Sequence, residues 1–163
     1  FDLLIEEGEE MGSLLWSSKA FREDDIIMCL QQPECAVISD TTALAPYGAL
    51  KNNIGSISGY GWAARFFQDY VNDKKILTLT EAIRRISSLP AERLGLIKRG
   101  QLKKTFYADI CVFDPQKIKN NCDLKNLKTY PSGIEHVLVN GIFAVKNGNR
   151  TEFDGGQVLR DFN

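Results

Sequence analysis

The stretch Pro33-Glu-Cys-Ala-Val-Ile-Ser-Asp-Thr-Thr42 contains a short apolar run that ends in a carboxylate flanked by hydroxyl-bearing residues. The run Ala36–Ile38 is too short for a helix and is bounded by a proline and a polar loop, which predicts a parallel strand covered on both faces. Asp40 would then follow the carboxyl end of that strand, where the sites of parallel sheets lie. An acid after a strand is more often a helix cap or an Asx turn, and both interpretations stay open at this point.

The composition predicts an ordinary globular protein. Its 163 residues are 44% hydrophobic and 25% charged, enough for one large domain or two small ones. The formal net charge is -1, so the electrostatic field of the protein would not attract nucleic acid or an anionic membrane, and we expect neither partner.

No apolar run approaches the roughly 20 residues of a spanning helix, and we expect a cytoplasmic location. The first residue is Phe1, and residues 1–7 read as the end of a helix, which predicts a fragment of a longer protein.

The cysteines and the single histidine predict no metal site of their own. Cys29, Cys35, Cys111 and Cys122 form no C-x-x-C pair, and His136 is distant from all of them in the sequence. This spacing predicts neither a zinc ribbon nor a disulfide framework. We expect Cys35 and Cys111 to be buried and reduced, and His136 to be a satisfied strand residue.

The first half of the chain reads as helices around one β-α-β unit. We expect a strand over 11–16, a helix over 21–31 and the strand 36–38. Residues 41–61 are rich in glycine, asparagine and proline, and a loop of this length usually serves a site. Residues 62–71 then carry an aromatic stripe at helical spacing, which favours core packing.

A further helix is predicted behind the capping box Thr78-Leu-Thr-Glu81, in which Glu81 would reach back to the cap. Arg84 and Arg85 should lie off its apolar face, in solvent, and Pro90 should end the helix.

A composition shift near Gly95 predicts a mainly helical part before it and a mainly β part after it, and beyond Gly100 the period changes to that of strands. We expect a strand over 107–113 and a hairpin of strands 134–139 and 142–145. The turn Asn140-Gly141 supplies the positive φ angles of a type I′ turn.

Several stretches together look like the C-terminal portion of the N-acyl-D-amino-acid deacylases, the D-aminoacylase branch of the amidohydrolase superfamily. The similarity runs in order along nearly the whole chain. The stretches are Ile38-Ser-Asp-Thr-Thr-Ala-Leu-Ala-Pro46, Tyr60-Gly-Trp-Ala-Ala64, Leu77-Thr-Leu-Thr-Glu-Ala-Ile-Arg-Arg85, Ser88-Leu-Pro-Ala-Glu-Arg-Leu-Gly-Leu96, Lys98-Arg-Gly100, Tyr107-Ala-Asp-Ile-Cys-Val-Phe-Asp-Pro115 and Gly133-Ile-Glu-His-Val-Leu-Val-Asn-Gly141.

The resemblance implies an α/β fold in two parts. Residues 1–95 would be the last units of a (β/α)₈ amidohydrolase barrel with trailing helices. Residues 96–163 would be the β-rich C-terminal part of a small β-sandwich. It also implies zinc in the complete protein, and we expect none bound by these 163 residues alone, because the family's other metal ligands lie on strands outside them.

Asp40 matches the family's catalytic aspartate after the eighth barrel strand. The resemblance implies that it takes a proton from a zinc-activated water, passes it to the leaving amine, and sometimes contacts the metal. Such a role suits a carboxylate beside a metal ion. Many relatives carry a histidine where this chain has Ser58, which makes Ser58 a candidate substrate-binding residue.

We therefore expect a zinc-dependent hydrolase of small N-acyl-D-amino acids in the complete protein, with the fragment inactive and prone to self-association. Two alternatives stay open. One is a cyclic-amide hydrolase of the hydantoinase or dihydropyrimidinase kind, and the other is a non-catalytic binding or assembly module.

Overall fold

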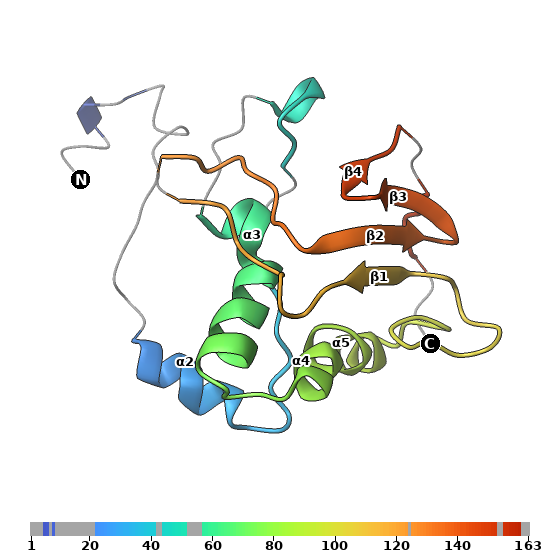
Figure 1. The fold of residues 1–163 in the computed structure, drawn as a ribbon, viewed down its shortest axis with the longest axis horizontal. Coiled ribbons are helices and arrows are strands. Elements are labelled where there is room, and N and C mark those ends of the chain that lie inside the picture. The colour runs from blue at the N-terminus through green and yellow to red at the C-terminus, as the bar shows by residue number, and fades with distance from the viewer. Residues whose placement is uncertain are drawn as a thin grey trace.

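The computed structural model describes residues 5–6, 8, 22–41, 44–51, 57–123, 125–152 and 155–160. The predicted strand over 11–16 and most of the predicted helix over 1–7 lie outside these residues. Helices occupy one side of the molecule and an antiparallel sheet the other (Figure 1). Across the described residues, every helix falls short of the length and apolar character that crossing a membrane requires.

The helices precede residue 95, as predicted. Helix α2 confirms the helix predicted over 21–31, while the helix predicted over 62–71 begins earlier and continues into a π-helical segment. In that segment the amide of Lys74 donates to the carbonyl of Asp69, five residues back, at 2.9 Å. The described elements are α2 (Glu23–Leu30), the 3₁₀ turn η2 (Gly48–Leu50), α3 (Ile57–Phe66), the π-helix η3 (Phe67–Asp73), α4 (Leu79–Ile86) and α5 (Ser88–Arg93).

The start of α4 confirms half of the predicted capping box. The amide of Glu81 donates to Thr78 Oγ1 at 3.2 Å. The predicted return contact from Glu81 to the cap is wrong, because its carboxylate binds the guanidinium groups of Arg84 and Arg85. The predicted stop at Pro90 is also wrong: α4 ends at Ile86, and Pro90 lies in the first turn of α5, where a missing amide leaves no helical bond unmade.

The sheet follows the order β1-β2-β3-β4, and each pair is antiparallel. The predicted hairpin is confirmed, with Asn140 and Gly141 at φ 51° and 82°. A second turn of the same kind joins β3 to β4, with Asn147 and Gly148 at φ 52° and 75°. The bounds are β1 (Ile110–Phe113), β2 (Ile134–Val139), β3 (Ile142–Lys146) and β4 (Asn149–Arg150), so the strand expected over 107–113 is shorter than predicted.

The predicted strand over 36–38 is wrong. These residues have no strand partner among the described residues, and Ile38 is 76% exposed. A strand exists only where a neighbouring strand pairs with it, and the four described strands form one antiparallel sheet that does not include residues 36–38. The expected burial of Cys111 is also wrong, because this residue is exposed on β1. Cys35 is half-buried, and both cysteines are free thiols.

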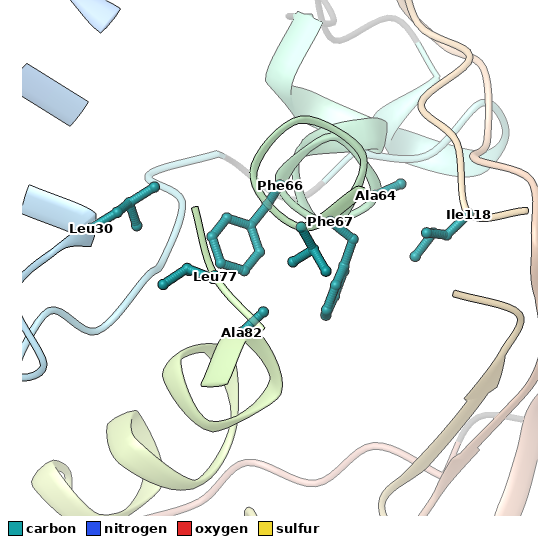
Figure 2. Packing of buried hydrophobic residues seen from close by; sticks show 8 residues of the cluster. Leu30, Ala64, Phe66, Phe67, Leu77, Ala82 and Ile118 are labelled. Atoms are coloured by element: carbon teal, nitrogen blue, oxygen red, sulfur yellow. The ribbon is translucent and has the colours of Figure 1, made fainter. Parts of the chain in front are cut away.

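One apolar core joins the helices to the loop after β1. Phe66 and Phe67 point toward Leu77 and Ala82, and Ile118 closes the cluster from the sheet side (Figure 2). Ala82 is fully buried, and Phe67 is 4% exposed. The aromatic stripe of the predicted helix therefore packs in the core, as expected. The core cluster consists of Leu30, Ala64, Phe66, Phe67, Val71, Leu77, Ala82 and Ile118.

Candidate functional site

Asp40 lies on an irregular segment, and its side chain is exposed. The hydroxyls on either side of it contact each other, with Ser39 Oγ and Thr41 Oγ1 2.5 Å apart. The amide of Thr41 also donates to Ser39 Oγ at 3.1 Å. These contacts close a short turn over Asp40, whose side chain stays exposed.

The same loop contacts the start of α3. Thr41 Oγ1 donates to the carbonyl of Ser58 at 3.4 Å and lies 3.5 Å from Ser58 Oγ. Ser58 is exposed in the first turn of α3. The two candidate site residues, Asp40 and Ser58, therefore lie on adjoining segments, where a carboxylate and several hydroxyls could contact one polar molecule.

The segment before Asp40 is held by α4. The amide of Val37 donates to the carbonyl of Arg85 at 3.0 Å. The prediction that Arg85 lies in solvent is wrong, because its side chain is only 3% exposed. An apolar-face pattern counts arginine as polar, so it missed a guanidinium that is buried with its partners.

Glu81 is the acidic partner of this buried arginine. Its Oε1 accepts from Arg85 Nε and from Arg84 Nη2, each at 2.8 Å. Hydrogen bonds from Arg84 and Arg85 lower the pKa of Glu81 to about 2. The carboxylate stays ionised in all ordinary buffers. The signal in the sequence was the spacing of one acid and two bases at i, i+3 and i+4.

The described residues do not form a metal site. Within them, no three histidine, cysteine, aspartate or glutamate side chains gather closely enough to hold a metal ion. Asp40 alone supplies one candidate ligand, on an exposed segment, whereas zinc in proteins is held by three or four. The donor set of these residues does not fit a zinc ion.

His136 takes a structural role, as predicted. Its Nδ1 accepts from the amide of Asn147 at 3.2 Å, and its ring packs edge-on against Phe143 with centroids 5.6 Å apart. It lies on β2, in the sheet, and is bonded within the hairpin.

Three residues from the motifs of the second half, Arg99, Asp109 and Asn140, also meet in one network. Arg99 forms an ion pair with Asp109, and its Nη2 donates to Asn140 Oδ1 at 2.8 Å. The amide of Asn140 donates to Asp109 Oδ1 at 2.8 Å, and its side chain donates to the carbonyl of Gly155 at 2.6 Å. Arg99 and Asp109 therefore bind each other and both bind Asn140, so the network ties the hairpin turn to the chain before β1.

The comparison with solved structures places the chain beside amidohydrolases. It matches N-acyl-D-glutamate deacylase from Bordetella bronchiseptica, complexed with zinc and a phosphonate mimic of the tetrahedral intermediate, with a TM-score of 0.67 and 29% identity over 80% of this chain and 27% of that one. It also matches a D-aminoacylase described as defining a novel subset of amidohydrolases, with a TM-score of 0.54 and 28% identity over 56% of this chain and 19% of that one. No protein-family model matches the chain.

Sequence comparison gives the particular relatives. The chain is 37% identical over 102 residues to N-acyl-D-glutamate deacylase of Alcaligenes xylosoxydans xylosoxydans, which is 63% of this chain and 21% of that protein. The predicted resemblance to N-acyl-D-amino-acid deacylases is confirmed by these relatives. The matched part spans 20–21% of the length of the curated relatives.

Proposed function

We propose that these residues are the C-terminal part of a metal-dependent amidohydrolase that hydrolyses N-acyl-D-amino acids. The observation that carries the proposal is the similarity to two N-acyl-D-glutamate deacylases. The chain is 37% identical in sequence to the Alcaligenes protein, and 80% of it matches the structure of the Bordetella protein. The complete protein is the product of the whole coding sequence that contains these residues.

The order of helices and strands supports a division of these residues into two structural parts. The helices end at Arg93 and the strands begin at Ile110. We assign residues 1–95 to the last units of a (β/α)₈ barrel and residues 96–163 to a small β-sandwich. In a barrel, the segment 36–38 would gain the strand neighbours that it lacks among the described residues.

Asp40 is the proposed catalytic acid and base. Its carboxylate is exposed, so a substrate amide can reach it. It would accept a proton from the attacking water and then donate that proton to the leaving nitrogen, which would otherwise depart as an unstable amide anion. Ser58 lies on the adjoining segment, so we propose that its hydroxyl binds the substrate.

We propose zinc as the cofactor of the complete protein, with the ligands that hold it supplied from outside the described residues. Zinc in such a site would supply positive charge beside the scissile bond. The 163 residues alone would then be inactive and would self-associate. Exposed apolar side chains support that expectation: Ile38, Leu102 and Val158 are 76%, 79% and 80% exposed.

The test is an assay of the complete protein, purified with zinc, against N-acetyl-D-glutamate, N-acetyl-D-leucine, their L enantiomers and hydantoin. Release of the free D-amino acid, with little turnover of the L forms, supports the proposal. Preferred turnover of hydantoin favours a cyclic-amide hydrolase. No turnover of any compound by zinc-loaded protein contradicts the proposal and favours a binding or assembly module.

A further inference from the structure

Arg85 is a charged residue that is buried on α4, although the helical pattern predicted it in solvent. Its side chain is 3% exposed, beside the fully buried Ala82 on the same helix. Burying a guanidinium costs free energy unless its donors are used. Its partners therefore indicate what the burial achieves.

Those partners lie on α4 and on the segment that leads to Asp40. Arg85 Nε donates to Glu81 Oε1 at 2.8 Å, and Arg85 Nη1 lies 3.5 Å from the carbonyl of Cys35, to which it donates. The main-chain carbonyl of Arg85 accepts from the amide of Val37 at 3.0 Å. One residue thus engages the segment through both its side chain and its main chain.

Neighbouring contacts strengthen the same junction. Arg84 also binds Glu81, and its Nη2 donates to the carbonyl of Pro33. Cys35 and Val37 pack against the apolar core, to which Ala82 belongs. In Figure 1 the segment after α2 runs upward beside α4. The backbone of residues 33–37 is therefore fixed to a helix anchored in the core, although it forms no strand.

Asp40 lies three residues after Val37, the last residue of this fixed backbone. Beside Asp40, the hydroxyls of Ser39 and Thr41 contact each other. We infer that Arg85 is a positioning residue that fixes residues 35–37 on α4 and thereby sets the place of the Asp40 carboxylate. This inference rests on the proposed catalytic role of Asp40. A displacement of about 1 Å at a reacting group can reduce a rate about 100-fold, so the junction would act on turnover more than on substrate binding.

The test uses the complete zinc-loaded protein with the N-acyl-D-amino acid that it turns over best. Arg85→Met fills the same space without the charge and should lower kcat about 100-fold with KM within about twofold. Arg85→Lys keeps a charge for Glu81 and should recover at least about tenfold of the lost kcat. The control is Arg93→Met, which removes the exposed ion pair between Arg93 and Glu34 and should leave kcat within about twofold.

Hydrogen exchange provides a readout that does not depend on activity. Arg85→Met should speed exchange in peptides covering residues 33–41 and leave the hairpin 134–146 unchanged. Unchanged exchange in both peptides, or equal loss in kcat for Arg85→Met and Arg93→Met, would overturn the inference. If Asp40→Asn is inactive while Arg85→Met keeps wild-type kcat, the inference fails and the proposed function stands. If Asp40→Asn keeps full activity, the proposed role of Asp40 fails, and the inference fails with it.

Discussion

The main-chain amide of Val37 donates a 3.0 Å hydrogen bond to the main-chain carbonyl of Arg85, which joins the segment before Asp40 to the last turn of α4. The position of the segment before Asp40 therefore depends on the stability of α4, which is distant in the sequence. Helix α4 begins at the Thr78 cap and contains only 8 residues, so each terminal hydrogen bond matters.

Removing the cap should loosen this helix. Thr78→Ala removes the acceptor for the amide of Glu81 and should lower the local opening free energy of α4 by about 1 kcal/mol. Hydrogen exchange of peptides covering residues 79–86 in the complete protein measures this as about fivefold faster exchange. Thr80→Ala, at an exposed position inside the helix, should change exchange little. Equal effects from the two variants would contradict the capping role.

The Glu81 carboxylate should make stability depend on acid. Because its pKa in the folded chain falls from 4.5 to about 2, its contribution is fully present above pH 4.5 and is lost as the pH falls toward 2. Glu81→Gln should therefore be less stable than the wild type at neutral pH, and the two should converge across that acid range. Urea unfolding midpoints of both proteins over a pH series measure the difference. A difference that stays constant with pH would show that the charge of Glu81 is not involved.

The two asparagine turns offer a matched pair. Asn140 and Asn147 both take positive φ before a glycine, so alanine is strained at either position. Only Asn140 belongs to the network with Arg99 and Gly155, so Asn140→Ala should lose about 1–3 kcal/mol more stability than Asn147→Ala. Thermal unfolding of the complete protein compares them. Similar losses would mean that the turn geometry, and not the network, sets the cost.

Ser58 should affect binding more than turnover. If its hydroxyl binds the substrate, Ser58→Ala should raise KM about tenfold and leave kcat within about twofold, because one hydrogen bond is worth about 1.4 kcal/mol. Steady-state kinetics of the complete protein measure both constants. Ser132→Ala, an exposed serine beside the sheet, is the control. A fall in kcat at constant KM for Ser58→Ala would rule out a simple binding role.

Local signals predicted the parts of the fold that local geometry decides. The Thr78 cap and the Asn140-Gly141 turn each depend on a few neighbouring residues, and both formed as expected. The segment 36–38 did not form a strand, because a strand requires a neighbouring strand to pair with, and the residues of the segment itself do not determine that neighbour. The burial of Arg85 was missed because it depends on Cys35 and Val37, which are distant in the sequence.

The candidate site also divides into local and long-range parts. Asp40 and Ser58 were predicted from motifs, whereas no local pattern indicated that Thr41 would connect their segments. That contact depends on the path of the loop between them. The arginines of α4 showed helical spacing with Glu81, but their contacts with the chain before Asp40 required the folded structure.

The most direct measurement is the kcat of the complete zinc-loaded protein with Asp40→Asn on its preferred N-acyl-D-amino acid. The loss of a general acid and base should lower kcat about 100- to 10,000-fold while zinc content and thermal stability stay near those of the wild type. Asp24→Asn, at a side chain that is 78% exposed, should keep full activity. A wild-type kcat in Asp40→Asn would contradict the assignment of Asp40 as the catalytic residue of this chain.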